Sequence, residues 1–192
     1  MLTVLDFLDC DSVYSVTVVC EGLEFCGRKH IVTLGRRSEL LSTPFGARSF
    51  GDEVSNRKSI EFQLAPDSVW LAYFTALDEW AVPYIALHRD RLFKKRLAVE
   101  QVLESYKPRV SRRGTYPATV RCKINVGDSG AVRCWSALDQ RVAIPEDLRG
   151  YGLLPRMHIS HMWITNRECG FVVNRLDLQC IEDSTTCPFM EE

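Results

Sequence analysis

The sequence has no lysine or arginine before Arg28, no Cys-x-x-Cys pair and no long apolar run. A secretory signal needs a basic start, so we expect that residues 1–11 do not form one. A membrane span needs ~18 unbroken apolar residues, and no stretch approaches that length. The phosphate-loop pattern, HExxH and the glycine-rich dinucleotide fingerprint are also missing. We therefore expect a soluble, intracellular protein with no membrane contact, no metal and no cofactor.

The chain is a folded protein of ordinary composition. It has 192 residues, of which 46% are hydrophobic and 26% are charged. These values exclude a wholly disordered or collagen-like chain and predict one domain, because domains run roughly 100–200 residues. We place that domain at residues 1–181, followed by an acidic tail at 182–192 that we expect to be flexible.

The eight cysteines are expected to be buried thiols rather than disulfides, because the chain lacks a secretory start. The nearest approach to a metal site is Cys20, Cys26 and His30. This set has no fourth ligand, and its first spacing is too long for a zinc knuckle. The sequence thus predicts no metal centre.

The net charge of −1 conceals a strong asymmetry along the chain. Residues 1–26 contain five acids and no bases, and the last eleven residues are again acidic. Between them, residues 89–123 contain eleven bases and three acids. A basic centre between acidic ends is typical of a protein that binds a polyanion, although a solvated helix face followed by a charged loop has the same composition.

Strands are expected at both ends of the chain and helices in the middle. The N-terminal candidates are 13–20, 25–34 and 59–64, with a long loop at 42–59. Apolar spacing predicts a helix from Asp67, its N-cap, to Pro83 and a second helix up to about Tyr106, which together form the helical segment 66–107. The C-terminal strand candidates are 119–126, 131–137, 158–165 and 171–181. The fold class is therefore mainly β with a helical insertion (α+β), built around one antiparallel sheet that forms a closed or partly closed barrel.

One motif suggests an enzyme. Gly127-Asp128-Ser129-Gly130 matches the sequence around the nucleophile of chymotrypsin-like serine proteases. His30 or His88, with Asp78 or Asp90, could complete a triad, but the residues after Gly130 are Ala-Val rather than the usual Gly-Pro. The same four residues form an ordinary hairpin turn. We favour the turn and predict no catalytic residue.

Aromatic residues lie among the cations of the central segment. Binding of a single-stranded nucleic acid requires a cationic groove and flat aromatic rings on which bases stack. Tyr116, which follows Arg112-Arg113-Gly114, is the aromatic residue that we most expect to be accessible. Phe45 and Phe50, beside Arg48, come next.

Four segments carry a family resemblance: 91–100 (RLFKKRLAVE), Tyr106-Lys107-Pro108-Arg109-Val110, Tyr116-Pro117 and 121–124. Together they resemble single-stranded-DNA-binding proteins of large DNA viruses and algae. The resemblance extends over about residues 80–181, although Leu92 stands where that family has an aromatic residue. It implies an OB-fold-like barrel that binds single-stranded nucleic acid without catalysis, and a location in the nucleus, a viral replication compartment or a virion.

From these features we predict a protein that coats single-stranded DNA in replication, recombination or repair. RNA as the ligand, a homo-oligomer, and a replication-protein partner for the acidic tail remain open. A non-enzymatic viral structural or assembly protein is the alternative. The predicted nucleic-acid-binding residues are Arg91, Phe93, Lys94, Lys95, Arg96, Lys107, Arg109, Arg112, Arg113, Tyr116, Arg121 and Lys123.

Overall fold

The computed structural model describes residues 3–7, 16–19, 23–25, 31–34, 39–49, 56–93, 97–127, 131–165 and 168–182. Within this part of the chain, ten strands form one sheet and β1 (Thr3–Phe7) pairs with β2 (Val16–Val19) in a separate one. The strands of the large sheet are β3 (Leu23–Phe25), β4 (Ile31–Leu34), β5 (Ala47–Ser49), β6 (Arg57–Leu64), β7 (Val110–Ser111), β8 (Ala118–Asn125), β9 (Arg133–Trp135), β10 (Arg141–Val142), β11 (Tyr151–Ile164) and β12 (Cys169–Glu182).

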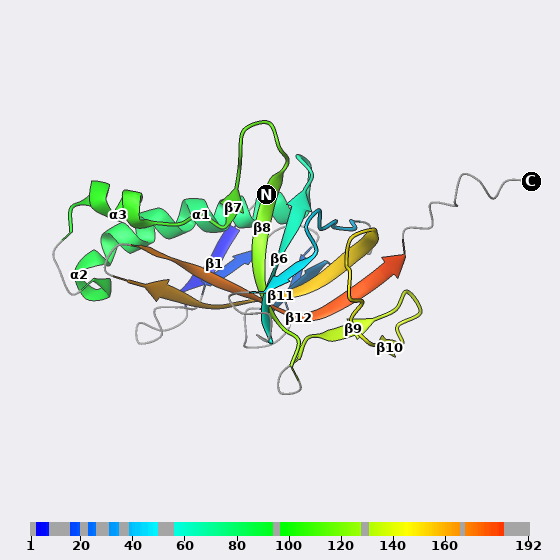
Figure 1. Ribbon diagram of the computed structural model, residues 1–192. Coiled ribbons are helices and arrows are strands. Elements are labelled where there is room, and N and C mark those ends of the chain that lie inside the picture. The colour runs from blue at the N-terminus through cyan, green and yellow to red at the C-terminus, as the bar shows by residue number, and fades with distance from the viewer. Residues whose placement is uncertain are drawn as a thin grey trace, which may run out of the picture.

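The β11–β12 hairpin is the longest pairing in the sheet (Figure 1). The main path of the sheet runs β3-β4-β11-β12-β8-β6-β5. Adjacent strands along this path are antiparallel, except for β12 and β8, which are parallel. β12 also pairs in parallel with β9, which in turn pairs with β10. The sheet is therefore mixed rather than wholly antiparallel.

Three helices follow β6: α1 (Val69–Leu87), α2 (Arg89–Leu92) and α3 (Val99–Ser105). They gather on one side of the sheet (Figure 1). The N-cap of α1 is Ser68, one residue after the predicted Asp67, and its hydroxyl accepts hydrogen bonds from the backbone N–H groups of Trp70 and Leu71. None of the helices in the described part of the chain has the length and apolar character needed to cross a membrane.

The prediction that Pro83 interrupts the first helix is wrong. A proline in a helix removes one backbone hydrogen bond, yet α1 continues for a further turn beyond it. Leu77, Ala81 and Ile85 are buried at four-residue spacing on both sides of Pro83. The packing of this continuous apolar face therefore outweighs the lost hydrogen bond.

The second predicted helix is two short helices. α2 ends at Leu92, and Phe93 adopts an extended backbone conformation with its side chain in the core. α3 begins after Ala98, whose backbone N–H donates to the Gln101 side chain at 2.9 Å. It stops at Ser105, close to the predicted end before Pro108. The helical insertion is therefore present, but its second half is broken by the burial of Phe93.

Two strand predictions also need correction. The expected loop at 42–59 contains β5 and the beginning of β6. The expected β8–β9 hairpin begins to form, because the Val132 N–H donates to the Asn125 carbonyl at 2.8 Å. β8 and β9 both pair in parallel with β12, so the two strands run in the same direction and do not form the expected antiparallel hairpin. Residues 128–130 themselves lie outside the described part.

The core lies between α1 and the inward face of the sheet. Trp70, Tyr73 and Phe74 from α1 are buried against one another and belong to the same apolar cluster as Ile60 and Phe62 from β6. Four cysteines in the described part, Cys122, Cys134, Cys169 and Cys180, are buried free thiols, as expected. The other four lie outside it.

Candidate nucleic-acid interface

The outward faces of β6 and β8 form a polar surface opposite the core. Along β6, Ile60, Phe62 and Leu64 point inward and are buried, so the intervening side chains point the other way. β8 alternates in the same manner, with Val120, Cys122 and Ile124 buried. Antiparallel register brings together three outward pairs: Ser59 with Lys123, Glu61 with Arg121, and Gln63 with Thr119.

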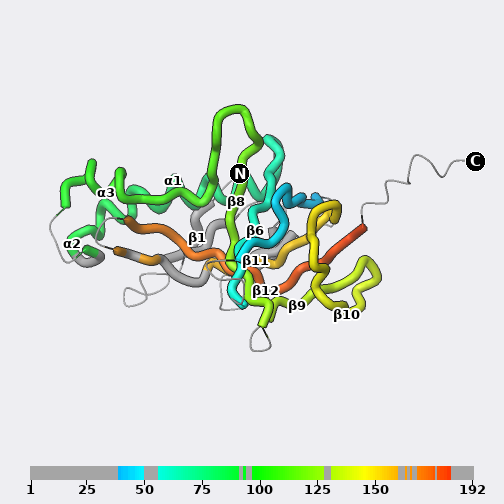
Figure 2. The backbone as a smooth tube through the Cα atoms, in the orientation of Figure 1, coloured from blue at the N-terminus to red at the C-terminus, as the bar shows by residue number. Residues whose placement is uncertain are grey.

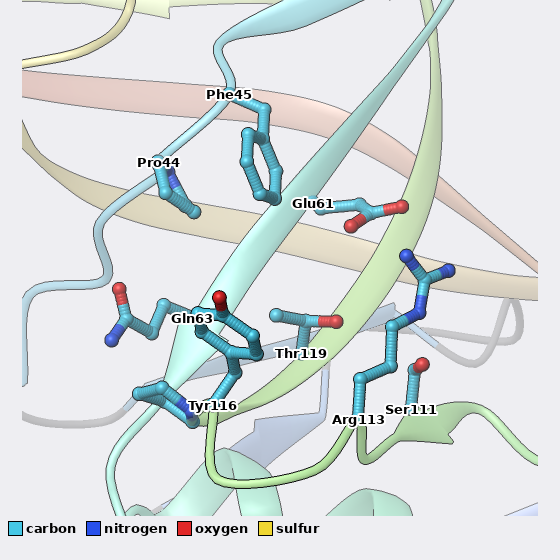
Figure 3. Close-up of a pocket in the computed structure, with 9 residues that line it drawn as sticks. Pro44, Phe45, Glu61, Gln63, Ser111, Arg113, Tyr116 and Thr119 are labelled. Carbon is cyan, nitrogen blue, oxygen red and sulfur yellow. The ribbon is translucent and has the colours of Figure 1, made fainter.

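A cavity of about 410 Å³ lies on this surface, and Figure 3 shows its lining. Phe45 comes from the segment before β5, and Tyr116 and Pro117 come from the β7–β8 loop. Figure 3 shows the two rings at opposite ends, with Glu61 and Thr119 to one side of them. The Phe45 side chain is 49% exposed and Tyr116 is 78% exposed. Two accessible aromatic rings thus flank one polar floor.

A second cavity of about 200 Å³ adjoins the first, because Phe45 and Glu61 line both. We call the two cavities together the β6–β8 groove. Its lining residues are Pro44, Phe45, Gly46, Arg48, Ser49, Ser59, Glu61, Gln63, Ser111, Arg113, Tyr116, Pro117, Thr119 and Arg121.

The groove carries more positive than negative charge. Its lining holds three arginines and one carboxylate, Glu61, which forms an ion pair with Arg121. The Arg48 guanidinium lies 4.5 Å from the centre of the Phe45 ring, a distance within the range of a cation–π contact. Lys123 is exposed on β8, two residues beyond Arg121 on the same face. The surface therefore combines cations with aromatic rings.

The loop that carries Tyr116 is anchored at its start and makes a turn at its tip. It projects from the body of the molecule between β7 and β8 (Figure 2). At its start, the backbone N–H groups of Arg109 and Val110 donate to the Asp78 carboxylate at 2.9 and 3.1 Å, which ties β7 to α1. At its tip, Gly114 has a φ of +56°, a conformation that glycine adopts without strain. The Tyr116 N–H then donates to the Arg113 carbonyl at 3.1 Å.

The structure brings together four of the predicted binding residues. Arg113, Tyr116 and Arg121 line the groove, and Lys123 lies beside it. Arg112 is exposed next to Arg113.

Other predicted residues lie elsewhere. Phe93 is only 7% exposed and belongs to the core, so its ring is not available for stacking. Lys107 forms an ion pair with Glu168 at the β11–β12 turn, and Arg109 is half-buried beside Asp78. Arg91 belongs to α2, whereas the Lys94-Lys95-Arg96 run lies outside the described residues.

Phe45 and Arg48 were singled out from the sequence as residues of a loop, but they were not assigned to the site. Glu61 and Gln63 were missed altogether. The signal that could have found them is the alternation in 59–64 (SIEFQL), which places both on the polar face of their strand.

The protease alternative gains no support from the surroundings of two of its triad candidates, Asp78 and His88. Asp78 binds Tyr106 and two backbone N–H groups, and the His88 ring lies 4.3 Å from that of Tyr84. Ser129 and His30 lie outside the described part. Among the described residues, no group of three His, Cys, Asp or Glu side chains is placed to hold a metal ion.

No protein-family model and no curated protein matches this sequence. Among solved structures, the chain is similar to gp2.5, a single-stranded DNA binding protein encoded by bacteriophage T7, with 12% identity, coverage of 81% of this chain and 87% of that chain, and a TM-score of 0.54. The single-stranded DNA-binding protein from bacteriophage Enc34 matches with 9% identity over 95% of this chain and 90% of that one, at a TM-score of 0.49. Its complex with single-stranded DNA matches with 9% identity over 80% of this chain and 86% of that one, at a TM-score of 0.47.

The likeness to gp2.5 confirms the predicted fold class, which is mainly β, OB-fold-like, and interrupted by a helical segment. At 12% identity it shows the fold alone. The resemblance to proteins of large DNA viruses and algae stays a prediction.

Proposed function

We propose that this protein binds single-stranded DNA in the β6–β8 groove and coats single strands during replication, recombination or repair. The observation that carries the proposal is the position of Phe45 and Tyr116, two exposed rings at the two ends of a groove lined by arginines. In proteins that bind single strands, bases stack on such rings while cations contact the phosphates. Two further observations support it: the fold is similar to that of gp2.5, and the basic excess of the sequence continues into Arg113, Arg121 and Lys123.

The chemistry of the groove favours a single strand over a duplex. Aromatic side chains stack on bases only where the bases are unpaired and exposed, whereas in a duplex each base already stacks on its neighbours. Because stacking tolerates any base, the groove should bind DNA with little sequence preference. The arginine side chains add a contribution that depends on salt, because each neutralised phosphate releases counterions.

Fluorescence anisotropy with labelled oligonucleotides tests this proposal. The full-length chain should bind a single-stranded oligonucleotide more tightly than a duplex of the same length. Tyr116→Ala and Phe45→Ala should each weaken single-strand binding by about 5- to 150-fold, which corresponds to the ~1–3 kcal/mol of one stacked base.

Leu138→Ala is the matched control, because Leu138 is as exposed as Tyr116 but lies beyond β9, away from the groove. It should leave the affinity unchanged. Equal affinity for duplex and single strand, or unchanged affinity in both aromatic variants, would reject the groove as a single-strand site. Tight binding to an acidic protein but not to DNA would favour the structural or assembly alternative.

A further inference from the structure

Two buried cysteines on neighbouring strands lie almost in contact. The sulfur atoms of Cys134 on β9 and Cys180 on β12 are 3.3 Å apart. β9 and β12 run parallel, with Cys134 opposite Leu178, so Cys180 lies two residues further along β12 on the same face. Both side chains are buried. A disulfide joins sulfur atoms about 2.05 Å apart, so only a small closure separates this pair from a covalent bond.

A buried arginine lies beside the two thiols. Arg175 on β12 is 4% exposed, and none of its guanidinium nitrogens has a hydrogen-bond partner among the described residues. Its electrostatic neighbours are Cys122, Cys134 and Cys180. A buried guanidinium without a counter-ion is costly, and the anion that these neighbours can provide is a thiolate. The same positive charge opposes the binding of a metal cation by these sulfur atoms.

The four described thiols differ in acidity. The hydrogen bond between the two thiols, helped by the charge of Arg175, lowers the pKa of Cys134. The same contact raises the pKa of Cys180. Burial raises the pKa of Cys122 to about 12 and that of Cys169 to about 11. Among the described cysteines, Cys134 is therefore the one whose thiol ionises most readily, and the thiolate is the nucleophile in sulfur chemistry.

We propose that Cys134 and Cys180 are a redox modification site that forms a reversible intramolecular disulfide when the protein meets hydrogen peroxide. The Cys134 thiolate attacks one peroxide oxygen, the O–O bond breaks, and the released hydroxide takes up a proton to form water. The thiol of Cys180 then attacks the sulfenic sulfur, and the sulfenic oxygen leaves as a second water molecule. Two thiols are oxidised to one disulfide and one peroxide is reduced to two waters. A dithiol reductant reverses the reaction by exchange.

Peptide mapping of the full-length protein tests the pairing. Trypsin releases Cys134 in 134–141 (CWSALDQR) and Cys180 in 176–192, which also contains Cys187. A Cys187→Ser background makes the assignment unique. After mild peroxide treatment and alkylation, the cross-linked pair of these peptides should appear, and dithiothreitol should remove it. Cys169, in 168–175 (ECGFVVNR), should stay reduced and serves as the internal control.

Two results of the mapping would overturn the proposal. The first is oxidation of Cys169 at the same rate as Cys134. The second is a Cys134 that stops at sulfinic acid without the cross-link, since this would show that Cys180 does not reach it.

The pH dependence of alkylation tests the role assigned to the thiolate. In the unmodified protein, the rate of Cys134 alkylation by iodoacetamide should rise with a midpoint well below that of Cys169. Arg175→Met should move the Cys134 midpoint upward, because the nearby positive charge is lost. The wild-type profile is decisive by itself, whether or not this variant folds. A Cys134 midpoint as high as that of Cys169 would reject the proposal.

Discussion

Asp78 on α1 accepts a 2.6 Å hydrogen bond from the phenol of Tyr106, 28 residues further along the chain. The same carboxylate accepts from the backbone N–H groups of Arg109 and Val110. One side chain thus connects the middle of the long helix to the end of α3 and the start of β7. Because β7 leads directly into the loop that carries Tyr116, this contact positions one wall of the β6–β8 groove.

Asp78→Ala should lower the free energy of unfolding by on the order of 2 kcal/mol, because it leaves the phenol and two backbone donors without their acceptor. Urea denaturation followed by circular dichroism measures the loss. Glu79→Ala is the control, since Glu79 is the next residue on α1 and is exposed. An equal, small effect of both substitutions would show that the Asp78 contacts contribute little.

Asp78 should also make stability depend on pH. Burial raises the pKa of this carboxyl above its usual 3.8 and outweighs the opposing hydrogen bonds from Tyr106, Arg109 and Val110. An acid with a raised folded-state pKa favours the folded state most at low pH, and this contribution is lost as the pH rises through the folded-state value.

Asp78→Asn, which cannot ionise, should therefore remove one downward step in the stability profile above pH 3.8. Urea titrations at several pH values measure that step. Parallel profiles for the variant and the wild type would contradict the shift.

Which side chains of a strand or helix are buried was predictable from the sequence. The period-2 alternation in 59–64 and 119–126 determines which side chains of β6 and β8 are buried, because neighbouring residues of a strand point to opposite faces. The helical spacing of Trp70, Tyr73 and Leu77 likewise predicted the buried face of α1. These features depend on short-range pattern alone.

The groove itself was not predictable in the same way. It is assembled from three segments that are distant in the chain: the residues around Phe45, the strand β6, and the β7–β8 loop. Which segments meet is decided by strand pairing, and no local pattern reports it. Phe93 shows the converse problem, because it lies in a basic run typical of a binding surface but is drawn into the core where the helix breaks.

Glu61→Gln should strengthen the binding of single-stranded DNA. Glu61 is the only carboxylate in the described lining of the groove, and it neutralises Arg121. Its removal frees one cation for a phosphate, so the dependence of log affinity on log salt should steepen by roughly 0.7.

Anisotropy titrations at several salt concentrations measure this slope. Glu104→Gln on α3, also exposed, is the control and should change neither affinity nor slope. A weaker affinity for Glu61→Gln would mean that Arg121 needs its partner to hold its position in the groove.

Two basic regions compete for the role of phosphate contact. One is Arg113 and Lys123 at the β6–β8 groove, and the other is the predicted run Lys94-Lys95-Arg96. If the groove binds the phosphates, Arg113→Ala with Lys123→Ala should flatten the salt slope by about 1.4, at roughly 0.7 per lost contact.

Salt titration of this double variant and of the triple alanine variant at 94–96 separates the two regions. Arg141→Ala on β10 is the control for the loss of an exposed charge outside the groove lining. A flattened slope in the triple variant alone would move the binding face to the helical segment.

The positive φ of Gly114, rather than the space around its Cα, should matter for binding. Its φ is +56°, and a Cβ atom added there would meet no atom within 4 Å, so Gly114→Ala introduces backbone strain without a clash. A left-handed conformation costs a residue with a side chain roughly 1–2 kcal/mol. The β7–β8 loop can relieve that strain by changing shape, and this change displaces Tyr116 from the end of the groove.

Single-strand affinity should therefore fall in Gly114→Ala and recover partly in Gly114→Asn, because asparagine tolerates positive φ better than alanine. Gly150→Ala is a matched control: Gly150 has a φ of +82°, equally open surroundings and a position outside the groove lining. It should carry a similar strain and leave DNA affinity unchanged. Equal losses of affinity in both alanine variants would show that general destabilisation, and not the placement of Tyr116, weakens binding.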